Sequence, residues 1–325
     1  MVKYSPWMGD GWGDKNNSFL KNTNMLMKER FQNHPDEVGR MNTEELRKAF
    51  VVADLMQAGK IRAVYSHYDR MVIGGVVPSK KEIVLQIYSQ LKAEYFLQHR
   101  EMGIINIGGE GIVKANGIEY TLNKLDCLYV GMGTKDVSFM SRNDTQPANF
   151  YFLSSGAHHT YENVSMKKAE AVIESLGNAT ACNQRVIYKY IHEKGIKSCQ
   201  LVMGLTALKE GNVWNTMPAH THNVGWKSIF IMTLMKAKGC FILWVSHNRR
   251  DTWYWVLTKQ LFLHHGPFMR VVAHQPTHLS GGWLEKINHL LIGILLRLRI
   301  YCKTNSGLFK IKIDVILKSI IEKNG

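Results

Sequence analysis

Short apolar runs, broken at regular intervals by glycine and asparagine, constrain the fold of this chain more than any other feature. Between residues 63 and 153 apolar and polar side chains alternate within each run, as in strands with one buried face. Turn residues recur about every eight to twelve positions, which predicts a β-sandwich or barrel. The expected strands are Val64–Tyr68, Met71–Val77, Ile104–Gly108, Gly111–Lys114, Ile118–Leu122, Cys127–Val130, Val137–Met140 and Phe150–Leu153.

Two segments of the chain are predicted to be helical. The first is Thr43–Phe50, where Thr43 is a candidate cap and acidic residues occupy the first turn. The second is Met166–Leu176, after which strands resume at Cys199–Leu205 and Val213–His222. The pattern predicts a mostly β chain of two stacked barrels. Its expected parts are an N-terminal extension at 1–40 that is disordered or precedes the true start, a first barrel at 41–165, a helical linker at 166–198, a second barrel at 199–292 and a tail at 293–325.

The formal charge of +15 is concentrated in the last third of the chain. Residues 1–222 hold 26 Lys and Arg against 22 Asp and Glu, whereas residues 223–325 hold 15 against 4. The same last third shows no long stretch of helical or strand periodicity. A basic protein often binds nucleic acid or an anionic membrane. Because this excess is confined to a segment without periodicity, we predict no nucleic-acid partner.

Targeting signals and cysteine usage indicate a cytoplasmic protein. The first 40 residues lack the apolar segment and small-residue cleavage site of a secretory signal. The five cysteines are scattered and form no C-x-x-C pair, which argues against a disulfide framework and a thiolate zinc site. The apolar stretch Leu290–Ile300 is too short to cross a bilayer and is interrupted by two arginines. We therefore expect no membrane partner.

His220 and His222 form the most chemically suggestive motif, within Pro218-Ala219-His220-Thr221-His222. On a strand alternate side chains face the same way, so the two imidazoles can share one cation. A surface or core histidine pair is the alternative, and the H-x-H pattern alone does not decide between them. Cupin-type metal sites usually add a carboxylate about five residues later and a third histidine further on. Here the fifth position is Lys227, so the motif supplies half a site.

Longer blocks of sequence resemble the 5-keto-4-deoxyuronate isomerase family, and the resemblance extends from about Phe31 to His222. The resemblance implies a fold of two cupin-like barrels, the second carrying the metal site. After His222 it stops within one residue, because that family continues with a segment close to Glu-Arg-Arg-Met-Glu-Val-Tyr-Phe. The blocks that carry it are Tyr65–Gly75, Arg100–Gly109, Leu128–Gly131 and Trp214–His222.

A change of reading frame accounts for this abrupt end. Asn223–Ile229 can be written AAC GTC GGA TGG AAG TCT ATT; one added G in front regroups it to encode Glu-Arg-Arg-Met-Glu-Val-Tyr. The same shift turns Leu263–Met269 and Thr277–Ile287 into segments typical of the family. In the restored frame a Glu replaces Lys227 and a His replaces Met269, which completes a His-His-Glu-His site. We predict a frameshift after His222 that disrupts the second barrel, with a tail read past the lost stop codon.

The resemblance implies an isomerase that converts 4-deoxy-L-threo-5-hexosulose uronate to 3-deoxy-D-glycero-2,5-hexodiulosonate in pectin and uronate degradation. It also implies one Zn²⁺ per subunit, held by His220 and His222 with the two restored ligands, and a homohexamer. Arg185 is a candidate partner for the substrate carboxylate, with a surface ion pair as the alternative. Glu101 and His67 are candidate substrate contacts, with buried structural pairing as the alternative. The general base is not assigned.

Two other functions remain open from the sequence. A non-catalytic cupin would bind sugar acids without converting them, and a decayed gene would give an inactive product. The chain with the present sequence is expected to bind zinc poorly, because two imidazoles are an incomplete site and the Lys227 ammonium opposes a cation.

Overall fold

The computed structural model describes residues 27–209 and 212, and the backbone of five later strands. The chain divides into two compact units, residues 1–276 and 277–325, and every described residue belongs to the first. No helix among them is long and apolar enough to span a bilayer. The five later strands are β16 (Trp226–Phe230), β17 (Gly239–Trp244), β18 (Thr252–Leu257), β19 (Leu261–His265) and β20 (Met269–Val272).

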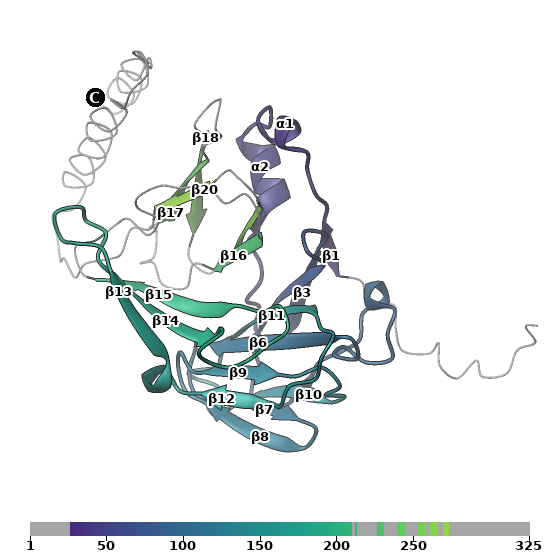
Figure 1. Cartoon of the computed structure of the whole chain (residues 1–325). Coiled ribbons are helices and arrows are strands. Elements are labelled where there is room, and N and C mark those ends of the chain that lie inside the picture. The colour runs from purple at the N-terminus through teal and green to yellow at the C-terminus, as the bar shows by residue number, and fades with distance from the viewer. Residues whose placement is uncertain are drawn as a thin grey trace, which may run out of the picture. The chain divides into compact units, whose positions relative to one another are not determined.

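A seven-stranded sheet organises the first barrel (Figure 1). Its order is β1-β3-β4-β11-β6-β9-β12, and all neighbours are antiparallel except β1 and β3. The predicted strands of this region are confirmed, most of them within a few residues. The strands are β1 (Lys28–Arg30), β3 (Ile61–Ser66), β4 (Met71–Val76), β6 (Arg100–Asn106), β9 (Cys127–Val130), β11 (Phe150–Gly156) and β12 (Val164–Met166).

A four-stranded antiparallel sheet of order β5-β10-β7-β8 completes the barrel. Asn116 and Gly117 form the two-residue turn between β7 and β8, with φ of 47° and 83°. Both angles lie in the left-handed region that such hairpin turns require and that Asn and Gly tolerate best. The strands are β5 (Ile83–Val84), β7 (Gly111–Ala115), β8 (Ile118–Leu122) and β10 (Val137–Ser141).

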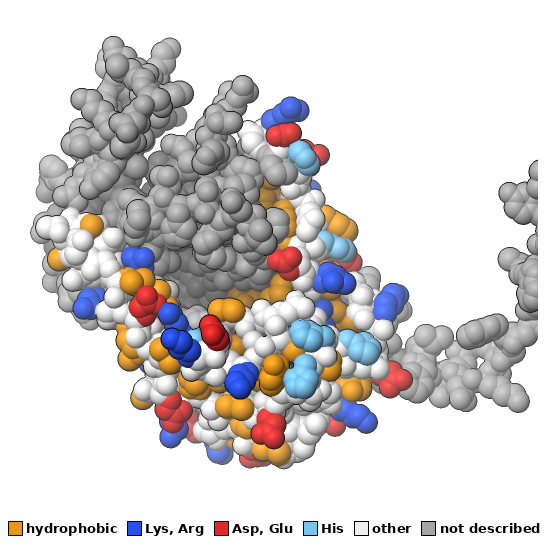
Figure 2. All heavy atoms as spheres, in the orientation of Figure 1, with side chains coloured by type: hydrophobic (Ala, Val, Ile, Leu, Met, Phe, Trp, Pro, Cys, Tyr) orange, Lys and Arg blue, Asp and Glu red, His pale blue; other side chains and the backbone are white. Residues whose placement is uncertain are grey.

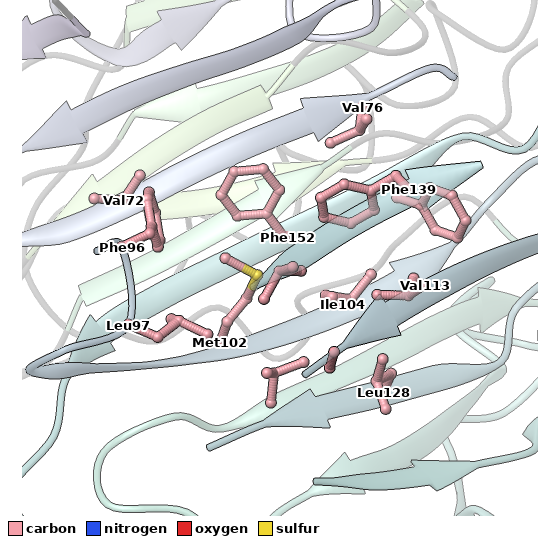
Figure 3. Packing of buried hydrophobic residues seen from close by; sticks show 14 of the residues in the cluster. Val72, Val76, Phe96, Leu97, Met102, Ile104, Val113, Leu128, Phe139 and Phe152 are labelled. Carbon is pink, nitrogen blue, oxygen red and sulfur yellow. The ribbon is translucent and has the colours of Figure 1, made fainter. Parts of the chain in front are cut away.

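The barrel interior is an apolar cluster contributed by both sheets (Figure 3). Phe152 is fully buried at its centre, and Gly74 lies directly opposite it in the pairing of β4 with β11. A Cβ at Gly74 would collide with the Phe152 ring, so the glycine makes room for the aromatic side chain. Labelled members are Val72, Val76, Phe96, Leu97, Met102, Ile104, Val113, Leu128, Phe139 and Phe152.

The opposite face of the seven-stranded sheet is also buried. Along β6, Met102 and Ile104 belong to the interior cluster, whereas Ile105 belongs to a second cluster with Tyr190 and Leu201. This alternation follows the two-residue period of a strand. Successive side chains of β6 therefore lie on opposite faces of the sheet. Arg100 and Glu101, at the start of β6, accordingly lie in two different environments.

Residues 166–198 do not form the predicted helical linker. After one 3-10 turn at Lys168–Glu170, the chain forms β13 (Val172–Leu176), which pairs with β14 (Arg185–Ile191) and then β15 (Met203–Leu208). The helix-forming residues here were misleading because pairing with β14 outweighs local propensity. Ile173, on β13, is 56% exposed.

The helix predicted at residues 43–50 is confirmed as α2 (Thr43–Phe50). Its cap is Asn42 and not Thr43: the Asn42 side chain accepts from the Glu45 N–H, and the Glu45 carboxylate accepts from the Asn42 N–H. This reciprocal arrangement is a capping box. The helix is followed directly by β2 (Val51–Val52), which pairs with β19.

The expectation of a disordered extension at residues 1–40 fails for its second part. Residues 28–30 form β1 alongside β3, residues 35–38 form α1 (Pro35–Val38), and Met27 is buried. Residues 1–26 lie outside the described residues. The Gln90 side chain forms hydrogen bonds with both backbone groups of Met27, so the residue that precedes β1 is held in place.

The later strands form two small antiparallel sheets, β16-β19-β2 and β18-β17-β20. The strand predicted at Val213–His222 lies outside the described residues. The domain boundaries and the disruption of the second barrel therefore remain predictions.

Candidate functional site

The predicted metal pair, His220 and His222, lies outside the described residues. The backbone of the two positions where ligands are expected after frame restoration is described. Lys227 is on β16, opposite His264, and Met269 is on β20, opposite Trp244. The two positions thus belong to different sheets, and the described residues contain no group of three His, Cys, Asp or Glu side chains suited to a metal ion.

Glu101 is completely buried at the start of β6, on the face that carries the second apolar cluster. One carboxylate oxygen accepts from the N–H groups of Gln200 and Leu201, at 2.7 and 2.9 Å, and from the Ser155 hydroxyl at 3.2 Å. The other accepts from the Tyr129 hydroxyl at 2.7 Å and the Cys199 N–H at 2.8 Å.

These five donors hold the Glu101 carboxylate, and the three backbone donors among them fix the segment 199–201 against the sheet. Burial, followed by the hydrogen bond to Glu101, raises the pKa of Tyr129 far above its usual range, so its hydroxyl remains a donor. A general base needs an accessible lone pair within reach of the substrate. The arrangement of Glu101 instead matches the structural alternative, a buried carboxylate that holds a loop.

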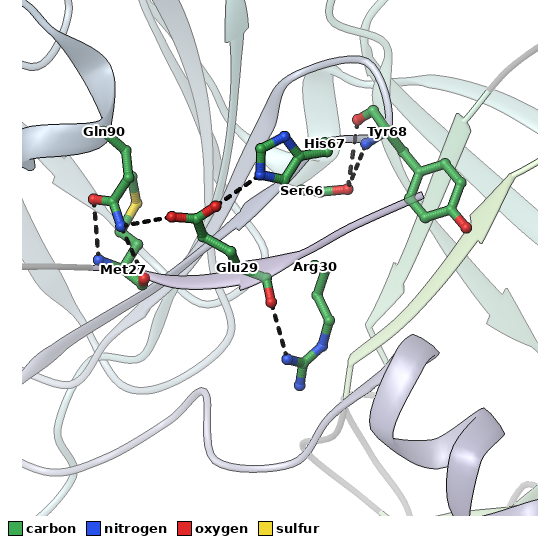
Figure 4. Close-up of polar contacts among 7 residues, drawn as sticks. All are labelled: Met27, Glu29, Arg30, Ser66, His67, Tyr68 and Gln90. Carbon is green, nitrogen blue, oxygen red and sulfur yellow. Dashed lines mark hydrogen bonds and ion pairs between the residues drawn. The ribbon is translucent and has the colours of Figure 1, made fainter. Parts of the chain in front are cut away.

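His67 lies in the turn after β3, where it joins the N-terminal segment to the barrel (Figure 4). Its Nε2 is 2.8 Å from the Glu29 carboxylate, and its ring stacks on Phe31 with centroids 4.4 Å apart. Hydrogen bonds from His67 and then Gln90 lower the pKa of Glu29. The histidine therefore docks β1, and its side chain remains 37% exposed.

Arg185 is the first residue of β14 and is half-buried. Its Nη1 donates to the Asn183 carbonyl at 3.0 Å, and it forms no ion pair with a carboxylate of the described residues. Its guanidinium keeps further donors for another acceptor.

The structure does not join the three described candidates into one site. No hydrogen bond, ion pair or ring contact connects Glu101, His67 and Arg185 to one another in the described part of the chain. Sequence reasoning passed over Arg100, the neighbour of Glu101, which lines a cavity at the other face of β6. The available signal was its place in the block Arg100–Gly109, but that block gave no reason to prefer it over the adjacent acid.

Comparison with known proteins decides the family. Residues 51–234 match the KduI/IolB family, which is more than half of the chain. This chain belongs to the KduI/IolB family. The match begins at β2 and includes the whole of the first barrel from β3 onward, as well as His220 and His222.

Family members with curated names are similar over the same region. A 4-deoxy-L-threo-5-hexosulose-uronate ketol-isomerase of Halalkalibacterium halodurans is 51% identical over 197 residues, covering 61% of this chain and 71% of the relative. Proteins of that name from Caldicellulosiruptor bescii and Bacillus subtilis are 49% and 44% identical, over 199 and 215 residues. These alignments cover 61% and 66% of this chain, and 71% and 78% of the relatives.

A solved structure supports the fold. An IolB-like protein from Salmonella typhimurium LT2 superposes with a TM-score of 0.50 at 14% identity, covering 75% of this chain and 99% of that one. At this identity the likeness concerns the fold alone. Together with the sheets described above, it confirms the prediction of a mostly β, cupin-like chain for this family member.

Proposed function

We propose that the gene for this chain specifies a ketol-isomerase acting on 4-deoxy-L-threo-5-hexosulose uronate and yielding 3-deoxy-D-glycero-2,5-hexodiulosonate. One observation carries the proposal: identity of 51% to a relative of that name, over 197 residues. The substrate would be a small uronate from pectin breakdown, and the protein a cytoplasmic homohexamer. The reaction moves a proton between adjacent carbons and needs a base and a group that stabilises the enediolate oxygen.

The two candidates from the sequence are not placed to act as the base. Both oxygens of Glu101 are occupied by donors, and the Nε2 atom of His67 is bonded to Glu29. The base therefore stays unassigned in this proposal. Arg185 stays a proposed partner for the substrate carboxylate, because its remaining donors suit a carboxylate.

Zinc dependence belongs to the frame-restored protein in this proposal. The residues of the present chain do not fit a complete site: His220 and His222 supply two ligands, Lys227 is a cation and Met269 is a weak ligand. The proposed change of frame after His222 rests on the regrouped codons described above. With the frame restored, a carboxylate and a third imidazole would complete the His-His-Glu-His set.

Two alternative functions follow from the presence of Lys227 and Met269 where metal ligands are expected. The missing ligands favour an inactive product of a decayed gene, and an intact barrel without a metal site would also suit a sugar-acid binding protein. A nucleic-acid binder is disfavoured, because acidic and basic side chains are interspersed over the described surface on the face drawn in Figure 2.

Parallel assays of two proteins test the proposal. The present chain and a version with one base restored after the His222 codon are purified, their zinc is measured after dialysis against a mild chelator, and conversion of the uronate is followed by NMR. We expect one zinc per subunit and turnover only in the restored version. Uronate binding without turnover by the restored version would support the binding-protein alternative, and full zinc retention by the present chain would contradict the proposed ligand set.

A further inference from the structure

A cavity of about 320 Å³ opens where the β3–β4 turn, the start of β6 and the end of β11 meet. Its floor includes Phe96, which packs edge-to-face on Phe152 of the barrel interior. The cavity is therefore the end of the first barrel's interior that is not filled by apolar side chains. The mouth of a barrel is a common place for a small-molecule site, and the volume falls in the range of such sites.

Arg100 is the central charged group of the cavity wall, and the residue is only 8% exposed. Its Nε donates to the Ser154 hydroxyl at 3.0 Å, and its Nη2 donates to the carbonyls of Ser154 and Arg70, at 2.6 and 2.8 Å. These bonds fix the guanidinium plane. In the described part of the chain Nη1 makes no hydrogen bond, and no carboxylate forms an ion pair with Arg100.

The surroundings of Arg100 increase the need for a negative partner. The pKa of Arg100 is lowered to about 10, chiefly by burial; Tyr65 acts in the opposite direction, and the nearby Arg70 adds to the lowering. Arg70, His99 and His158 also line the cavity, and among the described lining residues only Asp69 carries a carboxylate. A buried charge is ordinarily compensated by a counter-ion or by a full set of hydrogen bonds. Arg100 has the hydrogen bonds on one side, and no described residue supplies the counter-ion.

The geometry points to a hydroxylated small carboxylate, of sugar-acid size, as the ligand of this cavity, with its carboxylate on Arg100. Three features set the class. The guanidinium presents a free edge to an anion; the Tyr65 and Gln200 side chains can bond hydroxyl groups; and the volume is too large for an inorganic anion alone. A metal ion does not suit a wall with two arginines.

This inference does not rest on the proposed reaction. The described residues that line the cavity all lie between positions 65 and 200 of the chain. It predicts binding and not conversion, and the binding is independent of zinc.

Gly156 offers a way to close the cavity without touching its charges. It lines the cavity and pairs directly with Arg100 in the β11–β6 register, so a side chain there would share the face of Arg100. A Cβ at Gly156 meets no atom within 4 Å, which shows that the space above it is open. Gly156→Val would therefore occupy the part of the cavity next to Arg100 and leave the Arg100 hydrogen bonds in place.

The test is isothermal titration of the full 325-residue chain, in chelator, with D-galacturonate, D-galactose and inorganic phosphate as probes. We expect galacturonate to bind once per chain. Arg100→Met should weaken it by about 30-fold or more, as for loss of one partner of a buried charge pair. Gly156→Val should weaken it at least about tenfold by steric exclusion, and the exposed control Arg142→Gln should leave it unchanged.

Several results would overturn the inference. Equal affinity for galactose would remove the role of the carboxylate, and binding of phosphate alone would remove the role of the sugar frame. Absence of galacturonate binding by the parent chain, or binding unaffected by Gly156→Val, would remove the site. Hydrogen exchange of β4 and β11 in each variant verifies that the barrel is folded, so a loss of binding by Arg100→Met is separated from unfolding.

Discussion

Replacing Glu101 by Gln removes charge and one acceptor from a fully buried site at almost constant volume. In the parent chain one oxygen serves three donors and the other serves two. Whichever oxygen becomes the amide NH₂, that group then faces at least one backbone N–H of residues 199–201. The more favourable orientation directs the NH₂ toward the Tyr129 hydroxyl, which can rotate to accept, and abandons only the Cys199 N–H.

The magnitude follows from the hydrogen bonds lost. A hydrogen bond to a charged group contributes about 1.5–3 kcal/mol, and an unsatisfied buried donor costs a similar amount. Glu101→Gln should therefore cost at least about 2 kcal/mol in the local stability of the segment 199–201, a factor of about 30 in its opening equilibrium.

Hydrogen exchange measured by mass spectrometry is the appropriate assay, because residues 27–209 contain no tryptophan. We expect the amides of 199–201 to exchange about 30-fold faster in Glu101→Gln than in the parent chain. The matched control is Glu119→Gln. Glu119 is an exposed residue of β8 that pairs with Lys114 of β7, so its replacement should leave the exchange of these amides unchanged. Unchanged protection at 199–201 in Glu101→Gln would refute the structural role assigned to this carboxylate.

Three further predictions concern packing, pH and thiol chemistry. Gly74→Ala should destabilise the barrel by about 1–3 kcal/mol in denaturant unfolding, and Phe152→Leu should recover part of that loss; additive effects of the two changes would contradict their contact. The pKa of Glu29 is lowered in the folded chain. Its contribution to the stability of the folded state is therefore present above the ordinary carboxyl pKa of 4.5 and is lost as pH falls through the lowered folded value. Protection of the β1 amides, normalised to the intrinsic exchange rate at each pH, should therefore fall in acid, and Glu29→Gln should abolish that dependence; an identical pH profile in the variant would count against it. Burial raises the pKa of the Cys127 thiol, so iodoacetamide should modify the partly exposed Cys199 and spare Cys127 until the chain unfolds, and equal labelling of both would show this assignment to be wrong.

The strands of the first barrel could be predicted from the sequence because their signals are local. Ile118–Leu122 and Cys127–Val130 match the structure at both ends, since Asn116-Gly117 and the following turn residues punctuate an alternating pattern. The segment at 166–176 could not be predicted in the same way. Its local propensity is helical, and only its pairing with β14, a partner reached through a long loop, makes part of it a strand.

The site residues show the same division between local and long-range information. The H-x-H motif is visible because its two members are separated by one residue. The role of Glu101 depends on donors at Cys199, Gln200 and Leu201, about a hundred residues away along the chain. The unpaired guanidinium edge of Arg100 likewise follows from the shape of the barrel end, and no local pattern records it.

The most direct test of the account is the nucleotide sequence across the codons for Pro218–Ile292. The account predicts that one base restored after the His222 codon opens a continuous frame. That frame should read Glu-Arg-Arg-Met-Glu-Val-Tyr, with Glu in the place of Lys227 and His in the place of Met269. A shifted frame interrupted by stop codons, or one encoding neither ligand, would contradict the account and leave His220 and His222 as half a site.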